Sequence, residues 1–380
     1  MDVLYANHGT IPGASYDGSG MLLFPSTTII VMFRKKRHSK FVFYMQINYL
    51  CTRICENKDV VSVKMDLKKQ RIVYLDWSKT ICIFLMVVGH WTSNELLLRY
   101  IYSFHMPALF VISGYLYRPH SWIKTVISFC VPVIFCSFIN LVFLLSINEI
   151  PYDKLLSKEL LFRFFHYRYG LGEGLYCGDW FLWALLGLRF LFGDISICDF
   201  FRRYYKVLSV IVLLYMCFET YLVSVDTIFH GWYIGRLMPS LPFFCMGIFL
   251  KESNFSPTII PKYVIGLFIC LFTILPMING YCSINSSDYG ASYVLFFIEA
   301  VCATFLLFVI SSYLPFSNFI TIFSKGTLLI LGIHIPMLKL LDMLLPTCFD
   351  IIIPLVVFMG FYLPISWLDK RFPILLGKVR

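Results

Sequence analysis

The stretch VVGHWTSNELLLRYIYSFHMP, residues 87–107, places two histidines, His90 and His105, close together within a very apolar part of the chain. We interpret it as the outer turn between two adjacent membrane helices, with one histidine on each. A histidine side chain is costly in hydrocarbon, so ionisable residues near such a turn usually mark a site or a pathway. The stretch therefore raises two questions, whether the chain crosses a membrane and what the imidazoles do there.

The composition is that of a polytopic membrane protein. Of the 380 residues, 59% are hydrophobic and only 14% are charged, whereas soluble domains have about a quarter charged residues. Apolar runs of about 20 residues, enough to cross a hydrocarbon core of about 30 Å, recur along the chain. We predict an all-α, polytopic membrane protein with about ten transmembrane helices. The predicted segments are about 72–91, 100–117, 124–147, 179–193, 207–223, 233–250, 263–281, 293–314, 325–345 and 351–368.

The basic residues indicate the orientation. The formal net charge is +10, and much of it lies in alternate loops and at the C-terminal end, as in RPHSWIK (118–124), FFRRYYK (200–206) and DKRFPILLGKVR (369–380). Lysine and arginine are enriched in cytoplasmic loops, so we predict that both termini are cytoplasmic. The bases are scattered over membrane-edge loops rather than gathered into one patch, which argues against nucleic-acid binding.

The first 64 residues differ from the rest. The apolar piece Met21–Phe33 is too short to span a bilayer and precedes a basic run, RKKRHSK (34–40), which is the wrong order for a secretory signal. Met65 then opens MDLKKQRIVYLDW (65–77), a compact basic start ahead of the first apolar segment. We predict that residues 1–64 are an N-terminal extension outside the functional fold and that residues 65–380 form one transmembrane domain.

The first apolar segment carries Asp76, Lys79 and His90 on one helical face. Eleven residues at about 100° each return His90 to within roughly 20° of Lys79, about 16 Å farther along the helix. Ionisable residues inside a span usually face a bundle interior or a wet cavity. The alternative is an interfacial Asp76–Lys79 pair with the lysine reaching the cytoplasmic surface. This interfacial alternative does not apply to His90.

The second segment adds His105, Pro107 and the pair Ser113-Gly114. Two imidazoles that approach from neighbouring helices, those of His90 and His105, form a candidate general-base centre, because histidine titrates near neutral pH. His90 could act as a base or carry the acyl group covalently. Ser113 is a candidate binding residue, although close helix packing at Ser113-Gly114 explains the same pair.

Three later residues are further candidates. Arg236 and His334 lie within or at the edge of predicted spans, His334 in the run GIHIP (332–336). Such ions must find partners, which the sequence does not assign. Trp180 opens the fourth segment, where an aromatic membrane anchor is the alternative to a substrate contact.

Several stretches together resemble the acyltransferase-3 family of membrane O-acyltransferases, in particular the subgroup near fucose 4-O-acetylase and the enterobacterial-common-antigen O-acetyltransferase. The likeness runs in order over roughly residues 70–378. Its strongest element is a basic residue followed, after ten positions, by histidine, here Lys79 and His90, with lysine where many members have arginine. The stretches are YLDWSKTICIFLMVVGH (74–90), FHMPALFVISGY (104–115), GDWFL (178–182), LPFFCMGIFLK (241–251) and LILGIHIP (329–336).

The resemblance implies an acyltransferase-3-like fold of ten helices in the bacterial cytoplasmic membrane, with no bound cofactor or metal. It implies acetyl-CoA as donor and, as acceptor, a hydroxyl of a surface polysaccharide or its lipid-linked precursor. We expect His90 and His105 to be catalytic, and the expected binding residues are Lys79, Asp76, Ser113, Trp180, Arg236 and His334. The alternative is a flippase or exporter that uses the same polar stripe as a pathway for a lipid-linked glycan.

Overall fold

The chain divides into two compact units, Met1–Arg71 and Ile72–Arg380, in a computed structural model. The predicted boundary between residues 64 and 65 lies outside the described residues. Those described in the second unit are 72–119, 121–150, 175, 178–193, 196–222, 233–346 and 350–379. The described residues of the first unit form four strands. Strand β1 (Ser15–Tyr16) pairs antiparallel with β2 (Leu22–Leu23), and β3 (Thr28–Arg34) pairs antiparallel with β4 (Lys40–Gln46).

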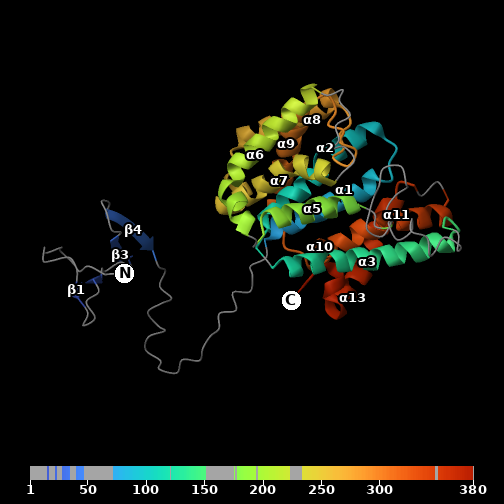
Figure 1. Ribbon diagram of the computed structural model, residues 1–380, viewed down its shortest axis with the longest axis horizontal. Coiled ribbons are helices and arrows are strands. Elements are labelled where there is room, and N and C mark those ends of the chain that lie inside the picture. The colour runs from blue at the N-terminus through green and yellow to red at the C-terminus, as the bar shows by residue number, and fades with distance from the viewer. Residues whose placement is uncertain are drawn as a thin grey trace. The chain divides into compact units, whose positions relative to one another are not determined.

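The regular secondary structure of the second unit is all helical in its described residues, apart from one isolated bridge in a loop (Figure 1). Its α-helices are α1 (Val73–Gly89), α2 (Glu95–Tyr115), α3 (Trp122–Ser146), α5 (Asp179–Leu191), α6 (Ser196–Leu222), α7 (Tyr233–Glu252), α8 (Lys262–Asn279), α9 (Tyr293–Ser312), α10 (Asn318–Lys325), α11 (Thr327–Leu344), α12 (Ile353–Gly360) and α13 (Tyr362–Arg371). Two 3₁₀ turns, η2 (Pro257–Ile259) and η4 (Pro373–Leu376), follow α7 and α13.

Each apolar segment predicted from the sequence coincides with a helix or a pair of helices. The ninth falls on α11 and shares only Lys325 with α10, and the tenth falls on α12 and α13. Six spans among the described residues are long and apolar enough to cross a membrane: Glu95–Tyr115, Trp122–Ser146, Lys262–Asn279, Tyr293–Ser312, Thr327–Leu344 and Ile353–Arg371. Helix α1 has 17 residues and α5 has 13, so both are shorter than a typical span. The number of crossings, about ten, stays a prediction.

The outer helices expose apolar side chains in a way that suits lipid. On α8, Leu267, Ile274 and Ile278 are each about half exposed or more. A soluble protein rarely leaves a contiguous apolar face of this kind uncovered. The apolar faces and the long apolar helices together make this a membrane protein.

Helix α2 lies at the centre of the bundle, against α1, α7 and α9, while α3 lies along α11 and α8 along α9 (Figure 1). Its contact with α7 depends on two glycines. A Cβ on Gly114 would lie 2.0 Å from the carbonyl oxygen of Phe244, and a Cβ on Gly247 would lie 2.0 Å from that of Val111. The two backbones therefore touch directly, as small residues allow in membrane helix pairs.

Gly114→Ala tests this contact. Alanine is favoured over glycine in a helix by about 1 kcal/mol, but here its methyl group collides with rigid backbone of α7. We expect a lower melting temperature in detergent, because overpacking of this kind typically costs about 1–3 kcal/mol. Gly266→Ala on α8 is the matched control, since a Cβ there meets nothing within 4 Å. Equal melting temperatures for Gly114→Ala and wild type would contradict the close approach.

Candidate functional site

The turn between α1 and α2 sets the position of the first histidine. Helix α1 ends at Gly89, and His90 follows as its C-cap. The backbone N–H of His90 donates a hydrogen bond of 3.0 Å to the carbonyl of Met86. Helix α2 then begins after Asn94, whose side-chain oxygen accepts the backbone N–H of Leu97 at 3.0 Å. This N-cap bond fixes where α2 begins. His90 therefore stands at the end of its helix, exposed, beside the first turns of α2.

His105 and His334 are buried and have the same local geometry on different helices. In α2, Nδ1 of His105 lies 2.6 Å from the carbonyl oxygen of Ile101. In α11, Nδ1 of His334 lies 3.0 Å from the carbonyl oxygens of both Ile330 and Leu331. A carbonyl oxygen can only accept a hydrogen bond, so we assign the proton to Nδ1 in both rings. In each ring Nε2 is then the atom with a free lone pair.

The three histidines gather around one cavity of about 230 Å³. The ring centroids of His90 and His334 are 5.0 Å apart. The ring of Tyr102 connects the other pair, because its centroid lies 5.1 Å from that of His105 and 6.2 Å from that of His90. Aromatic and polar residues that also line the cavity include Trp180, Tyr281, Ser283, Asn285 and Ser286.

His334 is the most constrained of the three. Its side chain is only 1% exposed, and its Nε2 has no hydrogen-bond partner within the part of the chain that the structure describes. An unpaired buried polar atom costs about 1–3 kcal/mol, so it indicates a group that a ligand or water completes. The sequence pointed to His90 and His105 as the catalytic pair, whereas His334 is the histidine whose ring lies nearest that of His90 among those described.

The position of His334 is supported from α3. Pro336 has no N–H, so it cannot bond the carbonyl of Gly332 one turn earlier in α11. The side-chain amide of Asn140 bonds that carbonyl instead, at 2.7 Å, and also bonds the carbonyl of Leu175 at 2.5 Å. Asn140 is buried. A single side chain thus satisfies the backbone oxygen that the proline leaves without its helical partner, two residues from His334.

Two other predicted residues lie at or beside this cavity. Trp180 lines it directly. Arg236 does not line it, but its Nε donates a hydrogen bond of 2.9 Å to the backbone oxygen of Asn285, which does. Ser113 is not among the lining residues. It precedes Gly114, where α2 touches α7.

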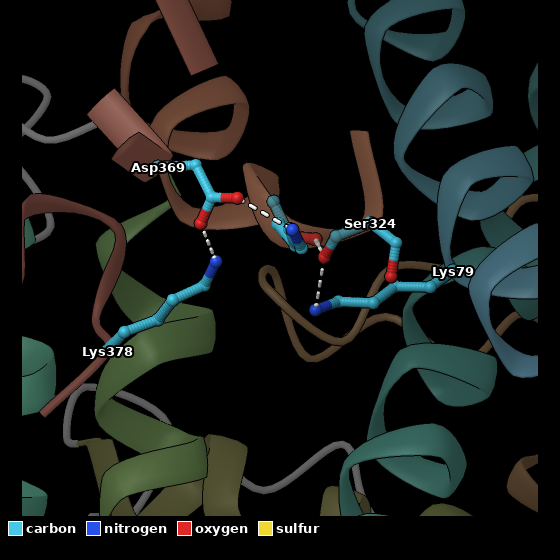
Figure 2. A network of polar contacts seen from close by, with 6 residues as sticks. Lys79, Ser324, Asp369 and Lys378 are labelled. Atoms are coloured by element: carbon cyan, nitrogen blue, oxygen red, sulfur yellow. Dashed lines mark hydrogen bonds and ion pairs between the residues drawn. The ribbon is translucent and has the colours of Figure 1, made fainter. Parts of the chain in front are cut away.

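Asp76 and Lys79 lie toward the opposite end of α1, near the place where α10 meets α11. Nζ of Lys79 donates to the carbonyl of Ser324 at 2.9 Å (Figure 2), and the hydroxyl of Ser324 donates to Asp76 at 2.6 Å. Near them, Asp369 accepts from Lys325 at 2.6 Å and from Lys378 in the C-terminal tail. We name this group of Asp76, Lys79, Ser324, Lys325, Asp369 and Lys378 the lysine network.

Sequence reasoning did not find several of these residues. Tyr102 and Asn285 line the cavity, and Asn140 supports α11, yet none of the three carries a charge that would draw attention within an apolar segment or loop. A buried asparagine in a run as apolar as α3 is itself a signal, since a polar amide there needs partners. Among the described residues, no group of three His, Cys, Asp or Glu side chains is arranged to hold a metal ion.

Asn140→Leu tests the support of α11. Leucine has about the same size but cannot donate, so the carbonyls of Gly332 and Leu175 lose the hydrogen bonds that this side chain gives them. We expect the free energy of unfolding to fall by about 1–3 kcal/mol for each carbonyl left unpaired, measured by thermal or denaturant unfolding in detergent. Asn318→Leu, at an exposed position on α10, is the control. A stability equal to that of the wild type would exclude this role of Asn140.

Comparison with known proteins gives one match. A family model described as an acyltransferase domain (Acyl_transf_3) matches residues 72–368. The match contains all three histidines of the cavity, as well as Asp76 and Lys79. No match was found among curated proteins or solved structures.

Proposed function

Because the chain belongs to the acyltransferase-3 family, we propose that it is a membrane O-acetyltransferase. It moves an acetyl group from acetyl-CoA to a hydroxyl of a cell-surface polysaccharide or of its lipid-linked precursor, in the bacterial cytoplasmic membrane with both termini cytoplasmic. The observation that carries the proposal is the cavity itself. Within the matched region, three imidazoles surround one space, and two of them, His105 and His334, have Nε2 available as a hydrogen-bond acceptor.

The proposed reaction needs one proton acceptor and no bound cofactor. An imidazole Nε2 takes the proton of the acceptor hydroxyl while the oxygen attacks the thioester carbonyl. The new C–O bond forms, the C–S bond breaks, and the imidazolium returns the proton to the leaving thiolate of coenzyme A. His90 is our candidate for this base, because it is exposed at the cavity and stands beside the rings of His334 and Tyr102.

The neighbouring histidines then support His90 rather than duplicate it. The Nδ1–H of His105 and that of His334 are both held by carbonyls of their own helices, so neither ring can turn freely. Their Nε2 atoms can accept a hydrogen bond from the acceptor hydroxyl or from His90 when it is protonated. Two acceptors with fixed orientations can hold the acceptor hydroxyl in place, and general-base catalysis requires that its proton lie within hydrogen-bond reach of the base.

In this proposal the lysine network binds the donor, acetyl-CoA. Coenzyme A combines an anionic nucleotide with a long, thin pantetheine arm, and only its thioester end has to reach the base. Lys79 lies on the same helix as His90, about 16 Å away along the axis, so the nucleotide phosphates at one end and the thioester at the other match the two polar ends of α1. Lysine here is a point charge for phosphate rather than a bidentate clamp.

Acetyl transfer from radiolabelled acetyl-CoA into glycan, with membranes that contain the full chain, tests the proposal. We expect label in the wild type and a loss of about 10²- to 10⁴-fold in His90→Ala, the usual contribution of a general base. Tyr263→Phe, at an exposed position on α8, is the control and keeps full activity. Movement of unmodified glycan across the membrane without any label in it would favour the transporter alternative.

A further inference from the structure

One wall of the cavity is a loop between two membrane helices, residues 280–292, which joins α8 to α9. It contributes Tyr281, Ser283, Ile284, Asn285 and Ser286 to the lining. The proposed chemistry uses none of these side chains. Hydroxyl, phenol and carboxamide groups on the wall of a reaction cavity are the groups that position a ligand with several hydroxyls.

The loop has a fixed shape. Ser283 and Asp288 exchange two backbone hydrogen bonds of 2.6 and 3.0 Å, which close a small turn around Asn285. The side chain of Asp288 accepts the backbone N–H of Gly290 at 3.0 Å. Gly290 has a φ of +68°, and a Cβ there would lie 2.2 Å from the carbonyl oxygen of Asn279. The loop therefore passes against the end of α8 at a position that only glycine permits.

Buried polar side chains secure both sides of this loop. Asn279, at the end of α8, donates to the carbonyl of Tyr289 at 3.1 Å and to the carboxylate of Glu299 at 3.0 Å, and it accepts the backbone N–H of Ser292 at 3.0 Å. Glu299 is 0% exposed. Arg236, 6% exposed, donates to the backbone oxygen of Asn285. Burying such groups is expensive, so their common use in holding one loop indicates that its geometry matters.

Asn285 has an incomplete set of hydrogen bonds. Its side-chain Oδ1 is buried and has no partner among the residues that the structure describes. Nε2 of His334, which also lines the cavity, is in the same condition. Two buried acceptors around one cavity require two donors. A ligand with two hydroxyls supplies both, because each hydroxyl has one proton to donate and can also accept.

We propose that Asn285 is a specificity-determining residue that hydrogen-bonds a second hydroxyl of the acceptor, in addition to the one that is acylated. Arg236 and the Asn279–Glu299 pair are positioning residues that hold the Asn285 loop against the cavity. The acceptor is therefore a molecule with several hydroxyls, such as a sugar ring, in preference to an isolated alcohol. This inference rests on the proposed acyltransferase function of the same cavity.

The test measures transfer of labelled acetyl groups to methyl glycosides of glucose, galactose, mannose and fucose, and then to the monodeoxy analogues of the best acceptor. For the complete glycoside, we expect Asn285→Ala to lower kcat/KM by about 10- to 100-fold through KM for the acceptor. For the one analogue that lacks the contacted hydroxyl, wild type and Asn285→Ala should agree within about twofold. KM for acetyl-CoA stays unchanged.

Two further variants separate recognition from structural damage. Arg236→Met, which has no donor, should raise KM for the acceptor and leave KM for acetyl-CoA unchanged, with partial recovery in Arg236→Lys, which keeps a donor to the Asn285 carbonyl. Asn318→Ala, at an exposed position on α10, is the matched control and behaves as wild type.

The outcomes that overturn the inference differ from those that overturn the proposed function. An Asn285→Ala variant that matches wild type on every glycoside, or that loses the same factor on the glycoside and on all its deoxy analogues, contradicts the role of Asn285 while leaving the enzyme activity in place. Wild-type protein that labels glycan in the membranes but none of the glycosides contradicts this inference alone, because recognition of one sugar ring would then not suffice. Wild-type protein that labels neither glycan nor glycosides contradicts the proposed function, and this inference with it.

Discussion

The site depends on a hydrogen bond that two buried histidines make with their own helices. In both α2 and α11 the imidazole Nδ1–H donates to a carbonyl one turn earlier, that of Ile101 or Ile330. The bond fixes the tautomer, holds the ring against its helix, and leaves Nε2 as an acceptor at the cavity. In hydrocarbon surroundings no water competes for these backbone oxygens, so the arrangement persists without a second side-chain partner. His90, at the exposed end of α1, completes the group.

Helix α1 joins two polar sites, one toward each of its ends, with apolar residues between them. The histidine cavity lies at one end, and the lysine network lies toward the other. Charges within a bilayer protein are tolerated where they pair or line a wet space, and Asp76 and Lys79 meet the first condition by sharing Ser324. The physical separation suits a reaction whose donor has an anionic head far from its reactive thioester.

The sequence predicted the parts of this arrangement that are local. Apolar runs located the helices, and the prediction that Lys79 and His90 share one helical face rests on their eleven-residue spacing. The adjacency of α1 and α2 brought His90 and His105 to one cavity. Sequence reasoning could not place His334 beside His90, because 244 residues separate them and only the packing of α11 against α1 joins them. Asn285 and Asn140 could not be identified from the sequence for the same reason, since the importance of each comes from partners on distant helices. The role of residues 1–64 and the number of membrane crossings stay predictions.

The most direct test of the histidine-centred account is a structure of the protein determined with a non-hydrolysable acetyl-CoA analogue. The account predicts that the acyl carbonyl lies in the cavity, within hydrogen-bond reach of the place where the acceptor hydroxyl would bind between His90 and His334. It also predicts that the nucleotide phosphates lie near Lys79. An acyl carbonyl found in a different part of the bundle, with the three imidazoles still closed around an unoccupied cavity, would contradict it.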